Sequence, residues 1–397
     1  MDYRSEVDDL LPADPHATLV GRLQLPGERG AHIVCTRGRR LVDLTPHAAT
    51  TADLLERDDL LPLVRDGDSS RSWDTADVVE ATLAGDASRP RLLSPIDVQV
   101  IKAAGVTFAT SMIERVIEEK SGGDATRALE IRERVQSVIG GAIGSVRPGS
   151  QAAAQVKTVL IEEGLWSQYL EVGIGPDPEI FTKAPVLSST GTASPIGVLE
   201  RSTWNNPEPE VVLAVTSAGR VVGAMLGNDV NLRDFEGRSA LLLAEAKDNN
   251  RSCAIGPMIR LFDEGFSRAD VERLEISLRV TGEDGFELRD GSSMSLMSRT
   301  LDELVQHTVG AHHQYPDGFA LFTGTLFAPT QDRDAPGLGF THHEGDIVRI
   351  ACPELGTLVN RVQSAESAPP WTFGIRAFYA DLAERGLLTA GAAVVSA

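Results

Sequence analysis

The sequence predicts an α+β protein in which a small α+β domain precedes a larger β-rich domain, a mixed β-roll or β-sandwich. From about residue 185 onward, short apolar runs alternate with Gly, Pro, Asn and Asp, which is typical of many short strands joined by turns. Residues 85–95, GDASRPRLLSP, are rich in turn-forming residues and are typical of a linker. A chain of 397 residues is long enough for two domains of unequal size. We therefore expect domains at residues 1–95 and 96–397.

The expected small domain begins with a polar arm over residues 1–15. Two strand-like segments follow, ATLVGRLQL and HIVCTRGRRLVDL, and the second contains a turn at Arg37-Gly38-Arg39. Short helices are expected around 50–57 and 75–84.

The expected large domain opens with a strand within 97–108. Helices are predicted near 110–120, 125–139 and 151–164, with Asp124 as an N-cap for the second of them. The strands of the β-rich part are expected in EVVLAVT, RVVGAML, RLEISLRVTG, GFALFTGTLFA, DIVRIAC and LGTLVNRV.

Composition excludes several classes of function. The 57 acidic residues outnumber the 37 basic ones, and the formal charge of −20 would repel a nucleic-acid backbone. No window approaches 18 uninterrupted apolar residues, and the N-terminus lacks the apolar segment of a signal peptide. Three widely spaced cysteines form no disulfide or zinc pattern, and no phosphate-binding or Rossmann glycine motif occurs. We therefore expect a cytoplasmic protein without membrane or nucleic-acid partners.

Three carboxylates form the strongest chemical signal. Glu208 and Glu210 lie two residues apart at the head of an apolar run, so both side chains would project from one face of a strand. A turn at residues 217–220 would return the chain so that residues whose numbers sum to about 437 lie opposite each other. Asp229 would then lie opposite Glu208, and Gly227 opposite Glu210, where it would leave space.

Such a cluster needs a cation, because neighbouring carboxylates repel each other. Ligation by oxygens alone favours Mg²⁺, with Mn²⁺ or Ca²⁺ as alternatives. The competing interpretation is a solvated face of an acidic protein, and the three acids alone do not separate the two.

Several motifs resemble those of the fumarylacetoacetate hydrolase family, which has a mixed β-roll core. In that family E-x-E precedes N-D-[VW]-[ST]-x-R-D. The matching residues here are Glu208-Pro209-Glu210 and Asn228-Asp229-Val230-Asn231-Leu232-Arg233-Asp234. Further matches follow in order at Lys247 to Pro257, Thr323-Gly324-Thr325, Gly345 to Val348 and Gly356 to Val362. The resemblance implies that Glu208, Glu210 and Asp229 bind the metal.

Departures from the family pattern favour one branch of it. Where the family's hydrolases have G-L-N-Y-x-x-H-x-x-E, this chain places Ser111 at the histidine position and keeps Glu114. Asn250 and Ala254 replace an Asp and a Pro. The chain resembles the sugar-acid dehydratase branch over nearly its whole length. That resemblance implies dehydration of 2-keto-3-deoxy-D-xylonate, or a related pentonate, to 2-ketoglutarate semialdehyde (2,5-dioxopentanoate) in pentose catabolism.

The implied chemistry assigns roles to further residues. Glu114 and Lys247 are the candidate acid and base, although a carboxylate at a helix start and a lysine paired with acids are the structural alternatives. The candidate substrate contacts are Ser111, Thr325, Arg233 and His313. Arg233 would support Asp229 or reach a carboxylate, and a structural hydrogen bond is the alternative role of His313.

Two other functions stay open from the sequence. A hydrolase of the same family would cleave a C–C bond of an acylpyruvate or of a 2,4-diketo-3-deoxy acid, and position 111 separates it from a dehydratase. A non-catalytic protein that binds a metal or keto acid is the other alternative. The partners we expect are a small 2-keto acid and further copies of the chain, in a homodimer or homotetramer.

Overall fold

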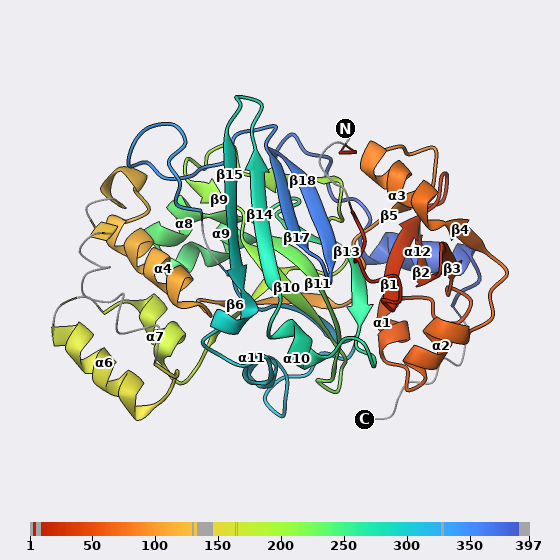
Figure 1. Cartoon of the computed structure of the whole chain (residues 1–397), viewed down its shortest axis with the longest axis horizontal. Helices are drawn as coiled ribbons and strands as arrows, with labels where there is room; N and C mark the ends of the chain where they lie inside the picture. The colour runs from red at the N-terminus through yellow and green to blue at the C-terminus, as the bar shows by residue number, and fades with distance from the viewer. Residues whose placement is uncertain are drawn as a thin grey trace.

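The computed structural model describes residues 3, 4, 9–128, 131, 132, 146–162, 164, 166–326 and 329–388. Two β-sheets form the centre of the molecule (Figure 1). The N-terminal part lies at one end of this centre, and a group of helices that includes α4, α6 and α7 lies at the other. No helix in the described ranges is long and apolar enough to cross a membrane.

The described residues of the N-terminal part form five strands and three helices, of which one helix (60–66) and two short strands (72–74 and 91–92) were not predicted. These are β1 (Leu19–Gln24), β2 (Ala31–Arg37), β3 (Arg40–Asp43), α1 (Thr51–Leu55), α2 (Leu60–Asp66), β4 (Ser72–Asp74), α3 (Thr75–Ala84) and β5 (Arg91–Leu92). Gly38 makes the predicted turn between β2 and β3 with a positive φ of 57°. The Asp74 side chain caps α3, and Gly85 ends it in the left-handed conformation.

The larger sheet contains strands from both predicted domains. Its order is β4-β3-β2-β1-β13-β11-β10-β16-β6-β7, with β5 paired to β1. The new members are β6 (Val100–Gly105), β7 (Glu179–Ala184), β10 (Pro209–Val215), β11 (Val221–Asp229), β13 (Cys253–Leu261) and β16 (Phe319–Phe322). Because β1 pairs with β13, the sheet continues across residue 95, and the domain boundary there stays a prediction.

A second sheet packs against the first across the main hydrophobic core. Its order is β15-β14-β17-β18-β8, formed by β8 (Ser194–Val198), β14 (Glu275–Thr281), β15 (Glu287–Ser293), β17 (Ile347–Cys352) and β18 (Gly356–Ser364). Inward-facing residues of both sheets, such as Val211 and Leu226 on one and Leu278 and Leu358 on the other, lie in one buried cluster. The arrangement agrees with the predicted mixed β-roll or sandwich.

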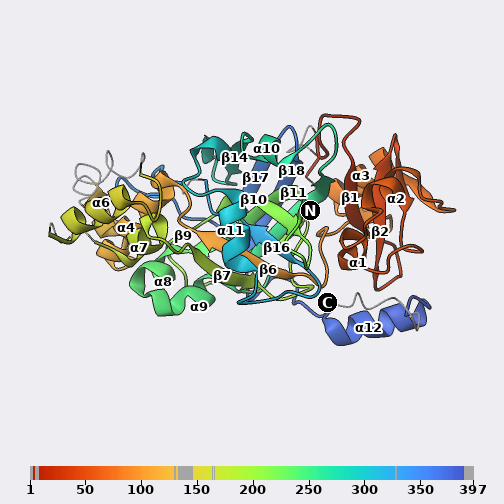
Figure 2. The same ribbon diagram turned by 90° about the horizontal axis from the view of Figure 1, so that it is seen from below.

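Helices cover the edges of the sheets. They are α4 (Ala109–Ser121), α6 (Gln151–Glu162), α7 (Gln168–Ile174), α8 (Arg233–Arg238), η1 (Ala240–Leu242), α9 (Leu243–Lys247), α10 (Arg268–Val271), η2 (Met294–Leu296), α11 (Leu301–Thr308) and α12 (Ile375–Glu384), and a two-stranded ladder joins β9 (Asn205–Asn206) to β12 (Asn231–Leu232). Most of the helix expected at 125–139 lies outside the described residues, although Asp124 accepts a bond from the Thr126 amide as an N-cap would. Figure 2 shows α12 beneath the N-terminal part, where the Asp381 carboxylate accepts a hydrogen bond from the Gly30 amide.

Candidate metal centre

The hairpin of β10 and β11 brings the three predicted ligands together. Glu210 pairs with Gly227, and the Asp229 amide donates to the Glu208 carbonyl at 3.0 Å, so the register is the predicted one. All three carboxylates are buried, and one oxygen of each lies within 4.8 Å of the others. Gly227 does not leave the space that we expected, because a Cβ there would lie 2.3 Å from the Phe322 ring. The glycine instead lets Phe322 pack against the hairpin.

Three cations contact the carboxylate triad. Lys247 Nζ lies 2.5 Å from Glu208 Oε2 and 3.2 Å from Asp229 Oδ2. Lys183 Nζ lies 2.7 Å from Asp229 Oδ1, and Arg115 donates to Glu208 Oε1. In the described part of the chain Glu210 has no such cation, and its Oε2 accepts only the Gly324 amide, at 2.7 Å.

These contacts shift the pKa values of Glu210 and Asp229 in opposite directions. Burial, followed by the charges of Asp229 and Glu208, raises the pKa of Glu210 well above its usual value. Burial also acts to raise the pKa of Asp229, but Lys183 and Lys247 outweigh it and hold that pKa below its usual value. The protein therefore stabilises an anion at Asp229 and leaves the negative charge of Glu210 uncompensated.

The charge of the whole cluster fits a divalent cation. Among the described residues, six buried carboxylates are connected through ion pairs and the triad to four buried cations, and a half-buried residue of each sign, Glu179 and Arg132, lies at the rim. The carboxylates belong to Glu114, Glu118, Glu208, Glu210, Asp229 and Glu236, and the cations to Arg115, Lys183, Arg233 and Lys247. With every group ionised, two negative charges remain unmatched, and buried charge of that kind is costly. An ion such as Mg²⁺ at the triad would balance them with its preferred oxygen ligands.

Arg233 and Glu114 belong to an outer layer of this cluster. Arg233 stacks on Trp204 at 4.3 Å and donates to Glu118 at 2.7 Å and to Glu114 at 3.0 Å. Arg233 thus contacts two carboxylates of the protein but not that of Asp229, and its contact with a substrate stays a prediction. Glu114 accepts hydrogen bonds from Arg132 on both oxygens and from Arg233 on Oε2.

The other predicted contacts lie near the start of α4. Ser111 is buried, and its hydroxyl donates to the Phe108 carbonyl at 2.9 Å. Thr107 Oγ donates to the Thr323 carbonyl, and Gly324 adopts a positive φ of 101° so that the chain passes close to Thr107. Thr325, also buried, follows directly in the segment that binds Glu210.

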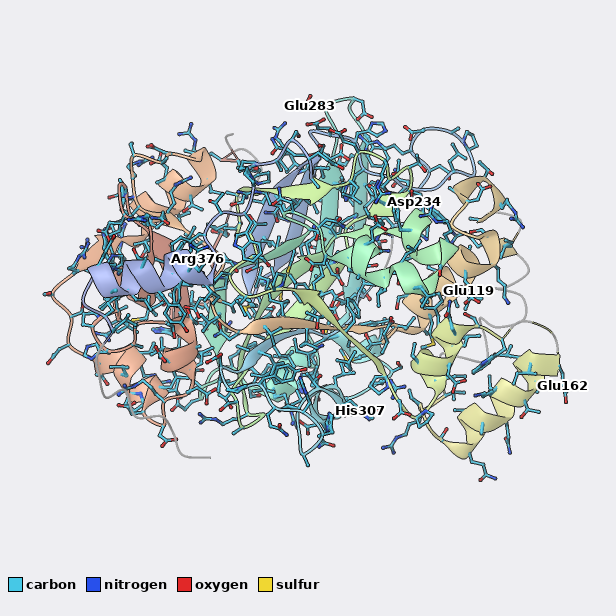
Figure 3. All side chains as sticks on the ribbon, turned by 180° about the vertical axis from the view of Figure 1, so that it is seen from behind. Glu119, Glu162, Asp234, Glu283, His307 and Arg376 are labelled. Atoms are coloured by element: carbon cyan, nitrogen blue, oxygen red, sulfur yellow. The ribbon has the colours of Figure 1, made fainter. Side chains whose placement is uncertain are left out.

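His313 is the predicted contact that the structure places elsewhere. It is exposed in a short turn after α11, with its ring against Tyr315. That turn adjoins Gly219 at the closed end of the hairpin, whereas the carboxylates lie at its open end, roughly 30 Å away at about 3.3 Å per residue. In Figure 3, His307 of α11 lies at the lower side of the molecule, and Asp234 of α8 lies at the upper side. The pairing of His313 with Tyr315 in the sequence indicated local packing, not a site.

Sequence reasoning missed Lys183, Arg115 and Glu179. Glu179 and Phe181 lie on the same side of β7, and the Phe181 ring is 5.8 Å from Lys247 Nζ. The Glu179 carboxylate extends over Gly105, where a Cβ would lie 1.9 Å from its Oε2. Glu179 is half-buried and has no hydrogen bond or ion pair with any residue in the described ranges. The only signal in the sequence was the presence of two charged residues, Glu179 and Lys183, in the strand-like segment EIFTKA.

The part of the chain that contains the carboxylate triad is similar to known proteins. Residues 206–363 match the model for the fumarylacetoacetate (FAA) hydrolase C-terminal domain. A probable 2-keto-3-deoxyxylonate dehydratase of Haloferax volcanii is 33% identical over 51% of this chain and 65% of its own length. A 2-dehydro-3-deoxy-D-arabinonate dehydratase of Saccharolobus solfataricus is 32% identical over 47% of this chain and 59% of its own length. The chain thus spans less than two thirds of either curated relative.

The fold has a solved counterpart. A structure of 2-keto-3-deoxy-D-arabinonate dehydratase complexed with magnesium and 2,5-dioxopentanoate superposes with a TM-score of 0.60 at 20% identity, over 87% of this chain and 99% of that one. The predicted fold class is therefore confirmed. The carboxylate triad lies within residues 206–363, the part of the chain that is similar to the fumarylacetoacetate hydrolase C-terminal domain.

Proposed function

We propose that this protein is a metal-dependent dehydratase that removes water from a 2-keto-3-deoxy-pentonate and yields 2,5-dioxopentanoate. The observation that carries the proposal is a buried three-carboxylate centre with a fourth carboxylate, that of Glu179, left unpaired beside it. Two curated relatives have names of this reaction class. Mg²⁺ is the proposed cofactor, held by Glu208, Glu210 and Asp229, and Mn²⁺ or Ca²⁺ would suit the same oxygens. When bound, the ion would withdraw electrons from the keto group and make the C3 protons more acidic.

Glu179 replaces our sequence-based candidates as the base. Glu114 holds two arginines, which leaves neither of its oxygens free to take a proton. The Lys247 ammonium already donates to Glu208 and Asp229, and those two carboxylates raise its pKa against the effect of burial. Glu179 has neither restriction, and burial raises the pKa of its carboxyl, which makes it a stronger base.

In the proposed reaction, Glu179 carries one proton from C3 to the departing hydroxide. Glu179 takes a proton from C3, and the electron pair of that C–H bond forms the C3–C4 double bond as the C4–O bond breaks. The departing hydroxide receives the proton and leaves as water, which restores the Glu179 carboxylate. A proton then shifts from C5 to C3, and the resulting C4–C5 enol becomes the aldehyde. No oxidant or reductant is consumed.

C–C bond hydrolysis is the less favoured alternative. It needs a base that activates water, and Ser111 occupies the position where the resembling hydrolases have histidine. The Ser111 hydroxyl donates to the Phe108 carbonyl and makes no hydrogen bond to a base among the described residues. We also propose, as finer points, the D-xylonate series as substrate, a role in pentose catabolism, a cytoplasmic location and a homo-oligomeric state. Size-exclusion chromatography with light scattering measures the last of these.

Two readouts test the reaction and the base separately. The first is formation of 2,5-dioxopentanoate from 2-keto-3-deoxy-D-xylonate with Mg²⁺, coupled to a semialdehyde dehydrogenase. The second is exchange of the C3 protons of 2-oxobutanoate in D₂O, followed by NMR, because this keto acid has no hydroxyl group to lose. Glu179→Gln is expected to lose at least about 100-fold in both, a typical contribution of a general base.

Glu114→Gln is the matched control, an equally isosteric change in the other candidate carboxylate. It is expected to keep proton exchange within about tenfold of wild type, since general-base loss costs more than this. Exchange that survives in Glu179→Gln but disappears in Glu114→Gln would reverse the assignment of the base. If the wild-type protein dehydrates no 2-keto-3-deoxy-pentonate, the proposed function is refuted.

A further inference from the structure

The carboxylate hairpin continues beyond the triad into the short ladder of β9 and β12, which has two cross-strand pairs. Asn206 of β9 pairs with Asn231 of β12, as Glu210 pairs with Gly227 further along. The sum of the residue numbers is the same for both pairs, so the register is unbroken between them. Asn206 lies two residues from Glu208, and Asn231 two residues from Asp229. The asparagine pair therefore lies on the same face as the carboxylates and is the next neighbour of the triad.

These two amides are buried without the hydrogen bonds that such groups need. Asn206 and Asn231 are both 0% exposed. Neither amide atom of Asn231 has a partner within the described residues, nor does Oδ1 of Asn206, whose Nδ2 donates to the Pro207 carbonyl. Native proteins satisfy nearly all buried amide groups, and each exception calls for a ligand or an ordered water.

The neighbouring Asn205 shows that this two-stranded ladder provides hydrogen-bond partners for a side-chain amide with a structural role. Asn205 Oδ1 accepts the His342 amide at 3.2 Å, and its Nδ2 donates to Ser202 Oγ at 3.2 Å. Asn205 faces the opposite side of β9 from Asn206. Of the two asparagines of β9, the one with an unpartnered side-chain oxygen is therefore the one on the side that carries the metal ligands.

The distances suit the far end of the proposed substrate. Residues two apart in a strand are separated by about 7 Å. In a five-carbon keto acid, the path from C2 to the C5 hydroxyl spans about 5 Å, at about 1.5 Å per bond with bent geometry. A keto acid placed at the triad would thus extend its hydroxyl end toward Asn231. An amide that both donates and accepts matches a hydroxyl group, which does the same.

We infer that Asn231, with Asn206, binds the terminal hydroxyl of the sugar-acid chain and selects hydroxylated keto acids over simple ones. The inference rests on the proposed function and adds the residues that recognise the substrate's distal end. The family motif that this chain resembles has Ser or Thr at position 231, so a shorter hydroxyl side chain is compatible with the local fold.

The test compares a substrate that has the hydroxyl with one that lacks it. For Asn231→Ser, the kcat/KM for dehydration of 2-keto-3-deoxy-D-xylonate is expected to fall at least about 10-fold, as the loss of one substrate hydrogen bond predicts. The kcat/KM for C3 proton exchange of 2-oxobutanoate is expected to stay within about twofold, because that ligand never reaches the amide. Asn206→Ser is expected to lower the ratio of kcat/KM for dehydration to kcat/KM for proton exchange in the same way. This variant replaces Asn231→Ser in the test if Asn231→Ser does not fold.

Asn205→Ser is the matched control, a structural asparagine on the same ladder, and it should leave the ratio unchanged. Equal losses on both ligands in Asn231→Ser and Asn206→Ser would mean a structural role and would overturn the inference. An unchanged ratio with full activity would overturn it as well. Neither result touches the proposed function, which fails only if the wild-type enzyme does not dehydrate the pentonate.

Discussion

Substitution of Glu210 by Gln separates metal binding from folding. Without a cation, burial and two neighbouring carboxylates raise the pKa of Glu210 well above its usual value, which favours the protonated form of this side chain. Glutamine imitates the protonated acid in size and charge, and its oxygen can still accept the Gly324 amide. We therefore expect the stability of the metal-free variant to lie within about 1 kcal/mol of wild type, close to the range of neutral substitutions. The stabilisation by Mg²⁺ should disappear.

The size of the effect follows from linkage. An ion at 100 times its dissociation constant stabilises the folded state by about 2.7 kcal/mol. With an unfolding entropy of about 2.1 cal/mol/K per residue, 397 residues give about 0.8 kcal/mol/K, so wild type should gain about 3 °C in Tm. Loss of a ligand should weaken binding at least about 100-fold, because even substitutions outside the ligand shell cost 10–100-fold. The gain in the variant would then be about 0.5 °C or less.

Thermal unfolding at pH 7.5, with EDTA and with a Mg²⁺ titration, measures both quantities. Glu119→Gln, the same change in a carboxylate of α4 that accepts from Ser167 and lies outside the triad, should keep the full gain. A variant of Glu210 that is several kcal/mol less stable without metal, or that keeps the Mg²⁺ gain, would refute this description of the site.

Three further predictions concern substitutions at Glu236, Asp346 and Asn250. Burial raises the pKa of Glu236 to about 7, so its contribution to stability is complete below its ordinary pKa and is lost as pH rises through about 7. The Tm of the metal-free protein should fall between about pH 4.5 and 7 and level off above that range, and this fall should be smaller in Glu236→Gln. The pKa of Asp346 is lowered to about 2 because Arg333 and other hydrogen-bond partners outweigh burial. This gives about 2.5 kcal/mol that is present above pH 4 and lost as pH falls through 2, and urea unfolding of Asp346→Asn at pH 7 should show that loss. Asn250→Asp would place a carboxylate against the carbonyls that the amide now binds in residues 365–369, so limited proteolysis should cleave the C-terminal segment faster while the core stays folded.

The hairpin and its ligands could be predicted because they depend on local information. The spacing of Glu208 and Glu210, a turn and the two-residue period of a strand were enough to place Asp229 opposite Glu208. The family motifs reinforced this register. Strand alternation also underlies the asparagine pair, although the sequence cannot show that its amides lack partners.

The rest of the site depends on contacts between distant segments. Arg115 lies 93 residues before the carboxylate that it contacts, and Lys183 belongs to a different strand of the sheet from Asp229. No spacing rule connects such residues, since their approach is decided by tertiary packing. Glu114 shows the same limit, because the family motif marks its position but not the two arginines that contact its carboxylate.

The most direct measurement is an NMR analysis of the carbon skeleton after incubation of ¹³C-labelled 2-keto-3-deoxy-D-xylonate with the protein and Mg²⁺. We expect one five-carbon product, 2,5-dioxopentanoate, which wild type forms and Glu179→Gln and Glu210→Gln do not. Unchanged substrate with the wild-type protein, or cleavage into two fragments such as pyruvate and a two-carbon product, would contradict elimination at this centre.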